Sequence, residues 1–122
     1  MRYILGTDIG TTAIKCAVIG EDGKVYGSRS SEYALTTLPS GEVEADLQHY
    51  IDAFKNSVKG AVQSSGVDVK DIRCIGFSST AETCVFLDEN NRPLCNVIAW
   101  MDTRATKEAE YLTFRFSRKD II

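Results

Sequence analysis

Residues 6–15 read Gly6-Thr7-Asp8-Ile9-Gly10-Thr11-Thr12-Ala13-Ile14-Lys15, and this stretch decides the fold. β-prone runs over residues 3–8 and 13–20 flank its centre, so we expect two strands joined by a tight turn. A phosphate loop of the Walker type would be followed by a helix instead. The stretch therefore predicts a β-hairpin with Gly10, Thr11 and Thr12 at its turn.

The groups at this turn are those that a nucleotide's phosphates require. Asp8 can hold Mg²⁺ directly or through water, because hard divalent cations prefer oxygen ligands. Gly10 leaves room for a phosphate, and Thr11 and Thr12 offer hydroxyl and backbone N–H donors. Lys15 adds positive charge on the second strand. The same turn also has a purely structural interpretation, in which Asp8 only accepts hydrogen bonds from the turn's own N–H groups.

The residues after this hairpin predict an α/β or α+β domain. A third strand over residues 25–33 follows the Asp22-Gly23 turn, which completes an antiparallel meander. Residues 35–41 read as a loop, and an amphipathic helix packed on the core runs from Asp46 to about Gly66. Acidic residues are expected at the N-terminus of this helix, where the macrodipole favours them: Glu42, Glu44 and Asp46.

The second half of the chain predicts further strands and one more helix. We expect strands over residues 72–78, 83–88 and 94–100, with a hairpin-like connection between the last two. The second helix should begin near Asp102. Such an order fits a sheet in which a helix returns the chain to pair another strand. The basic segment 113–122 keeps no clean period and is expected to be an irregular tail.

Composition excludes several classes of protein. The chain has 122 residues, 43% of them hydrophobic and 25% charged, which suits one compact domain. Its net charge of -3 argues against nucleic acid as a main partner. No apolar run approaches the roughly 20 residues of a membrane helix. Asp8 interrupts the first apolar run before an export signal could form, so we expect a cytoplasmic protein with no membrane contact.

The cysteines and the lone histidine carry no motif. The four cysteines have the spacing of neither a zinc ribbon nor a disulfide framework, and we expect them to be small buried residues: Cys16, Cys74, Cys84 and Cys95. His49 is expected on the surface of the first helix.

Three segments together resemble a known family. Asp8-Ile9-Gly10-Thr11-Thr12, followed by Asp22-Gly23-Lys24, is similar to the first phosphate-binding hairpin of the actin, sugar-kinase and Hsp70 superfamily. Residues 75–83 resemble the substrate strand of the carbohydrate kinases that include xylulokinase, glycerol kinase and gluconokinase. Residues 98–104 match the Trp-x-Asp-x-Arg pattern of those kinases. The resemblance covers residues 2 to about 110.

The resemblance implies a ribonuclease H-like (actin-like ATPase) mixed sheet with flanking helices, incomplete as an amino-terminal domain. Residues 1–112 would be the first part of that domain, and the second, adenosine-binding domain would be absent. The implied activity is transfer of the γ-phosphoryl of ATP to a hydroxyl of a small sugar, sugar acid or polyol. The family's catalytic Asp lies beyond residue 122, so no catalytic residue is assigned and the fragment alone should be inactive. Apolar surface left open by the missing part favours a homo-oligomer.

Site residues follow from the resemblance by position. Asp8 would lie near Mg²⁺, and the ATP phosphates would contact Gly10, Thr11, Thr12, Ala13 and Lys15. The substrate would contact Ala81, Glu82, Trp100, Asp102 and Arg104. Lys15 stands where glycerol kinases carry an arginine. Lysine keeps the positive charge but cannot bind a phosphate through two N–H groups at once, as arginine does. Ala81-Glu82 replaces the Arg-Glu of glycerol kinases and the Met-His of xylulokinases. Asp102 and Arg104 could instead form only a helix cap.

Two other functions remain open at this stage. Ribonuclease H-like nucleases also carry an Asp at the end of the first strand, but they need further carboxylates converging on two metals. A non-enzymatic actin-like nucleotide-binding module would be distinguished by extra assembly loops, and none is evident in the sequence.

Overall fold

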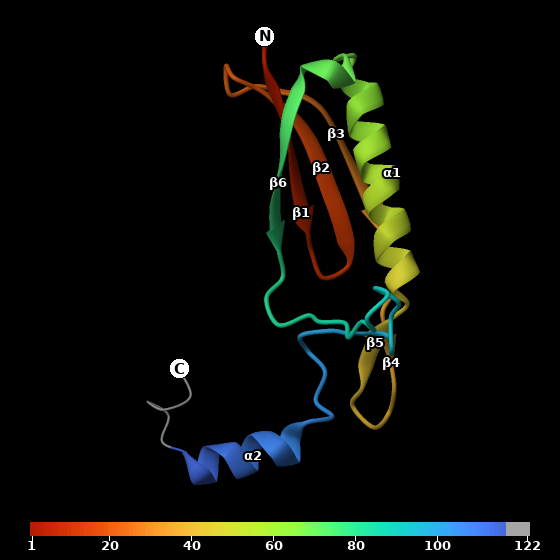
Figure 1. The fold of residues 1–122 in the computed structure, drawn as a ribbon, viewed down its shortest axis with the longest axis vertical. Coiled ribbons are helices and arrows are strands. Elements are labelled where there is room, and N and C mark those ends of the chain that lie inside the picture. The colour runs from red at the N-terminus through yellow and green to blue at the C-terminus, as the bar shows by residue number, and fades with distance from the viewer. Residues whose placement is uncertain (117–122) are drawn as a thin grey trace.

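A mixed four-stranded sheet forms the body of the protein. The computed structural model describes residues 1–116. The antiparallel meander β1 (Tyr3–Ile9), β2 (Ala13–Gly20) and β3 (Val25–Glu32) is extended on the other side of β1 by the parallel strand β6 (Ile72–Ser79). The strand order is β3-β2-β1-β6 (Figure 1). The predicted meander and mixed sheet are therefore confirmed.

Helix α1 (Leu47–Ser65) covers one face of this sheet and closes the core (Figure 1). Asp46 caps it by accepting a 2.8 Å hydrogen bond from the N–H of Gln48, and Gly66 ends it with a φ of 64°. Its fully buried residues are small: Ala53, Ser57 and Ala61. Small side chains let the helix lie close to the strands, and the Ser57 hydroxyl donates to the Ile14 carbonyl of β2 at 2.8 Å. The predicted helix is confirmed at both ends.

A second, smaller sheet lies beyond the N-terminal end of α1. It consists of β4 (Thr36–Thr37), β5 (Val43–Ala45) and β7 (Val97–Ile98), in the order β4-β5-β7. The expected helix terminus at Glu42 and Glu44 is therefore wrong, since Glu44 lies in β5 and only Asp46 caps the helix. Strand β5 is extended because Glu44 and Ala45 pair with β7, a partner far along the sequence.

Residues 80–105 are less regular than predicted. Of the expected strands over 83–88 and 94–100, only β7 forms, and isolated bridges join Cys84 to Ile98 and Leu87 to Pro93. The hairpin-like connection is right, whereas the extended strands are wrong. Pro93 offers no N–H for a ladder, and most of the segment is exposed.

A short η1 turn (Val69–Asp71) precedes β6, and the last helix, α2, spans Thr106–Arg115. It begins after the predicted position near Asp102, because the Asp102 side chain and the turn around it bind β5 instead. It also continues past Leu112, so residues 113–115 are helical and not an irregular tail. Residues 117–122 of that predicted tail lie outside the described residues. Helix α2 stands away from the sheet and buries none of its side chains (Figure 1).

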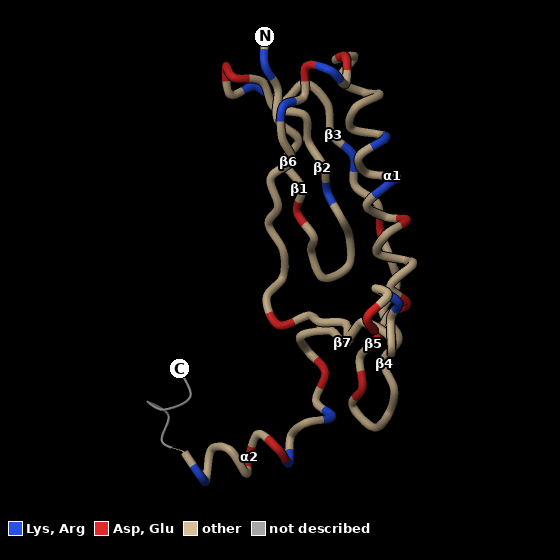
Figure 2. The backbone as a smooth tube through the Cα atoms, viewed as in Figure 1, with Lys and Arg blue, Asp and Glu red and all other residues tan. Residues whose placement is uncertain are grey.

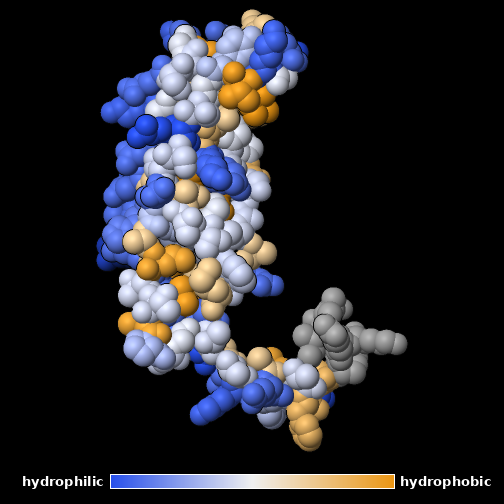
Figure 3. Space-filling view, turned by 180° about the vertical axis from the view of Figure 1, so that it is seen from behind, coloured by the Kyte–Doolittle hydropathy of each residue, from blue (hydrophilic) through white to orange (hydrophobic). Residues whose placement is uncertain are grey.

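Strand β6 forms one edge of the main sheet, and most of its side chains are exposed on both faces. Cys16 is buried as expected, but Cys74, Cys84 and Cys95 are exposed because β6 and the loop after it are uncovered. His49 is on the surface of α1, as predicted. Polar side chains gather along the α1 side of the body, and apolar patches lie towards its two ends (Figure 3). No helix within residues 1–116 is long and apolar enough to span a bilayer.

Candidate functional site: the hairpin and the Trp100 loop

The β1–β2 turn is tight, and hydrogen bonds from Tyr33 hold it in place. The Gly10 N–H donates to the Ala13 carbonyl at 3.0 Å, and a Cβ on Gly10 would lie only 3.0 Å from the same oxygen. The buried Tyr33 donates its hydroxyl to the Gly10 carbonyl, while its N–H donates to the Thr12 carbonyl at 3.0 Å. Burial raises the pKa of the Tyr33 phenol, which therefore stays protonated as a donor. These bonds hold the turn in one conformation, and Thr12 within it is exposed.

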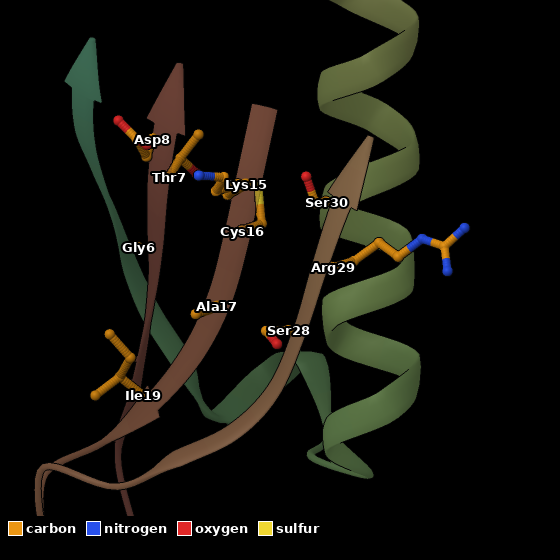
Figure 4. A pocket seen from close by; sticks show the side chains of 10 residues that line it. All are labelled: Gly6, Thr7, Asp8, Lys15, Cys16, Ala17, Ile19, Ser28, Arg29 and Ser30. Atoms are coloured by element: carbon orange, nitrogen blue, oxygen red, sulfur yellow. Dashed lines mark hydrogen bonds between the residues drawn. The ribbon is translucent and has the colours of Figure 1, made fainter. Parts of the chain in front are cut away.

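Asp8 and Lys15 place opposite charges on neighbouring strands beside this turn. They are paired in register across β1 and β2, and Ser78 of β6 flanks Asp8 on the other side. Figure 2 shows an acidic position on β1 beside a basic position on β2. Their side chains project into an open hollow of about 430 Å³, as Figure 4 shows. Alternation along the strands places this hollow on the face of the sheet opposite α1. The arrangement places one carboxylate and one ammonium group on this face of the sheet, beside the β1–β2 turn.

The residues here fit a Mg²⁺ ion that is shared with a nucleotide. Within residues 1–116, no three His, Cys, Asp or Glu side chains come close enough to build a metal centre alone. Mg²⁺ in phosphoryl-transfer sites commonly needs only one or two carboxylates, because water and phosphate oxygens complete its shell. The exposed carboxylate of Asp8 meets that requirement.

The loop between β7 and α2, residues 99–105, is here named the Trp100 loop, and it reaches the hairpin from a distant part of the chain. The indole N–H of Trp100 donates to the Thr11 hydroxyl at 3.2 Å, and the backbone N–H of Trp100 donates to the Thr83 hydroxyl at 3.2 Å. Ala81 and Glu82 are exposed and lie just after β6, beside the end of β1. Glu82 has a φ of 65°, a left-handed conformation uncommon for a residue with a side chain. These residues and the hairpin turn meet at the carboxyl ends of β1 and β6, where ligands of parallel sheets commonly bind.

Asp102 and Arg104 form an ion-pair cluster with the small sheet. The Asp102 carboxylate accepts from the N–H of Val43 at 2.8 Å and from the backbone and guanidinium of Arg104 at 2.7 to 2.9 Å. Arg104 also donates to Glu44 at 2.6 Å, and Asn96 donates to Glu44 at 2.8 Å. The Arg104 guanidinium holds the pKa of Asp102 well below its usual range. The Asn96 amide and then Arg104 lower the pKa of Glu44.

The structure thus divides the predicted site residues into two groups. It brings the hairpin, the segment after β6 and Trp100 together, whereas Asp102 and Arg104 bind β5 behind the Trp100 loop. The side chain of Asp102 is only 4% exposed, and its acceptor positions are filled by this chain. Sequence reasoning missed Tyr33, Thr83 and Glu44, which hold these parts in place. No local pattern marks them, because their partners are distant in sequence.

Comparison with known proteins agrees with this geometry. Residues 3–121 match the N-terminal domain of the FGGY family of carbohydrate kinases. The chain belongs to this family. The xylulose kinase of Bacillus subtilis is 32% identical over 116 residues, which cover 95% of this chain and 23% of that protein. FGGY membership favours the kinase hypothesis over the nuclease and the actin-like module.

Solved FGGY structures share the fold. The gluconate kinase of Lactobacillus acidophilus superposes with a TM-score of 0.84 and 31% identity, over 93% of this chain and 23% of that one. The glycerol kinase of Plasmodium falciparum, solved with ADP, gives a TM-score of 0.85 and 25% identity, over 99% of this chain and 24% of that one. The actin-like ATPase fold predicted from the sequence is confirmed. The chain spans about a quarter of the length of the relatives it matches.

Proposed function

We propose that this chain forms the phosphate-binding and sugar-binding part of an ATP-dependent carbohydrate kinase. The reaction is transfer of the γ-phosphoryl of ATP to a hydroxyl of a small sugar, sugar acid or polyol. The observation that carries the proposal is the Thr11–Trp100 contact, which joins the hairpin to the Trp-x-Asp-x-Arg segment in one site. Such a site can hold a phosphoryl donor and its acceptor side by side, as transfer requires.

At the phosphate side, the turn residues act as donors and the charged pair as an electrostatic clamp. Thr11 and Thr12 would offer hydroxyl and N–H groups to phosphate oxygens, with Ala13 beside them, and Gly10 leaves room for the phosphate because its own N–H bonds within the turn. Lys15 would offset the negative charge of the phosphates. Asp8 would hold Mg²⁺, which supplies charge neutralisation on the phosphates when it is bound. Tyr33 keeps the turn rigid, so the donors are oriented before the nucleotide arrives.

At the sugar side, Trp100 and the Ala81-Glu82 segment face the acceptor. Half of the Trp100 side chain is exposed, which leaves ring surface for the apolar side of a carbohydrate. Glu82 can accept hydrogen bonds from hydroxyl groups. We expect Asp102 and Arg104 to serve sugar binding mainly by holding the Trp100 loop against β5.

The remaining parts of the proposal concern residues and settings outside this site. A general base for the acceptor hydroxyl and the adenosine contacts are expected from residues other than these 122. We also propose a cytoplasmic location, since all four cysteines are free thiols and a reducing compartment keeps them so. Self-association through the apolar side chains that residues 1–116 leave exposed is also part of the proposal.

The test is ADP release by the full-length gene product that contains these residues. ATP, Mg²⁺ and a panel of pentoses, hexonates and polyols should give saturable, sugar-dependent ADP release, and residues 1–122 alone should give none above background. Absence of release by the full-length product with every acceptor would overturn the kinase assignment. Release by residues 1–122 alone would show that the base lies within them.

A further inference from the structure

A closed ring of hydrogen bonds joins the phosphate hairpin to the sugar-facing loop. The Thr80 N–H, just after β6, donates to the Ile9 carbonyl at the end of β1 at 3.0 Å. The Thr80 hydroxyl donates to the Thr83 hydroxyl at 3.3 Å, and Thr83 accepts from the Trp100 N–H. The Trp100 indole returns to Thr11, 89 positions away in the sequence. The ring therefore begins and ends on the same hairpin.

The polarity of the Trp100–Thr11 bond is fixed by chemistry. An indole N–H can only donate, so the Thr11 oxygen must be the acceptor at this contact. A threonine hydroxyl carries one donor and two acceptor positions. Because Trp100 occupies an acceptor position, the Thr11 O–H remains free to donate. Phosphate oxygens are acceptors, so a Thr11 hydroxyl that accepts from Trp100 can donate its own hydrogen to a phosphate oxygen.

Trp100 is itself held in place from the side opposite Thr11. Ala99, the residue before it, is 3% exposed and donates its N–H to the Val43 carbonyl at 2.9 Å. Asp102, two residues on, accepts from the N–H of Val43 and donates its own N–H to the Ala99 carbonyl at 2.9 Å. The small sheet therefore fixes the backbone on both sides of Trp100, and the indole reaches Thr11 from a rigid base.

We propose that Trp100 is a positioning residue for Thr11. It orients the Thr11 hydroxyl as a donor to a nucleotide phosphate, and it thereby couples the sugar-facing surface of the indole to the phosphate site. This inference rests on the proposed function, since it requires phosphate at the hairpin. A ligand that moves the indole ring changes the donor geometry at Thr11, and a phosphate on Thr11 in turn restrains the ring.

The kinetic test compares Trp100→Phe with the wild type in the full-length gene product. Phenylalanine keeps an aromatic face and removes the N–H, so kcat should fall about three- to tenfold while KM for the sugar changes less than about twofold. Thr11→Val should lower kcat at least as much in the wild type, and the double variant should be no slower than Thr11→Val alone. Thr11→Ser, which keeps the hydroxyl, should retain most of the rate.

Tyr26→Phe is the matched control, since Tyr26 loses a hydroxyl bonded to Asp22 at the far end of the meander and should leave kcat and KM unchanged. Multiplying effects of Trp100→Phe and Thr11→Val, or a change in the sugar KM alone, would overturn the positioning role.

A binding measurement separates this inference from the proposed function. The indole N–H resonance of Trp100, identified by its loss in Trp100→Phe, should shift on titration with inorganic tripolyphosphate, and Thr11→Val should abolish the shift. A shift of the indole resonance in a protein without kinase activity would contradict the proposed function and still support the coupling between Trp100 and Thr11. Normal kinase activity with an indole resonance that does not respond to tripolyphosphate refutes the coupling alone.

Discussion

Replacing Tyr33 by phenylalanine tests whether the Tyr33 hydroxyl keeps the phosphate hairpin rigid. The substitution removes the hydroxyl that donates to the Gly10 carbonyl and keeps the ring, which packs on Tyr50 at a centroid distance of 4.1 Å. A lost intramolecular hydrogen bond costs about 1 kcal/mol of unfolding free energy. For a domain of this size that corresponds to a fall of roughly 4 °C in Tm. The hairpin should also be less well oriented, so kcat should fall while KM for the sugar stays the same.

The assay is thermal and urea unfolding, paired with steady-state kinetics of the full-length gene product. Tyr26→Phe is again the control, because its hydroxyl is exposed and lies far from the turn. The raised pKa of Tyr33 adds a pH test with a definite sign. Its stabilising contribution is complete below about pH 10, where an unfolded tyrosine begins to ionise, and is lost as the pH rises further. An unchanged Tm together with an unchanged kcat for Tyr33→Phe would show that the bond does not hold the hairpin.

Three further substitutions test other parts of the structure. Asp8→Ala should lower kcat by about 10²–10³-fold in steady-state assays and leave sugar binding nearly intact, because the carboxylate serves the metal and phosphates; normal turnover would refute this role. Asp102→Ala should weaken sugar binding by about tenfold and hardly change ATP affinity in calorimetric titrations; an equal loss of both would contradict it. Gly27→Ala should lower the unfolding free energy by about 1–3 kcal/mol, because the new Cβ would lie 2.4 Å from the Ser65 nitrogen. Gly76→Ala, where a Cβ would meet nothing within 4 Å, is its control, and equal effects of the two in urea unfolding would refute the packing argument.

Local patterns predicted the parts of the fold whose causes are local. The Asp22-Gly23 turn forms as expected, with a φ of 77° at Gly23, since glycine adopts that conformation at no steric cost. The α1 boundaries follow from a capping side chain at Asp46 and a left-handed glycine at Gly66. These signals lie within a few residues of the structures that they determine, which is why the sequence shows them.

Long-range contacts account for what was missed. Its neighbours in the sequence suggest that Glu44 belongs to a helix terminus, whereas its side chain binds Arg104, 60 residues away. The loop from Thr83 to Trp100 has the β-prone composition of two strands, but its few backbone bonds leave most of it irregular. Trp100 and Thr11 were assigned separately from the family resemblance, to sugar and phosphate. Their direct contact could not be predicted from spacing, because nothing local relates positions 11 and 100.

The uncovered outer edge of β6 governs how this chain behaves while it is being made. Strands β1, β2 and β3 pair with their nearest neighbours along the chain, so they can assemble early in synthesis. β6 arrives later, and within residues 1–116 no strand pairs with its other side. Its apolar residues Ile75 and Phe77 are also exposed. An open edge of this kind is a template for any extended segment nearby. The period before this edge is covered is therefore the interval in which a nascent chain is most exposed to aggregation.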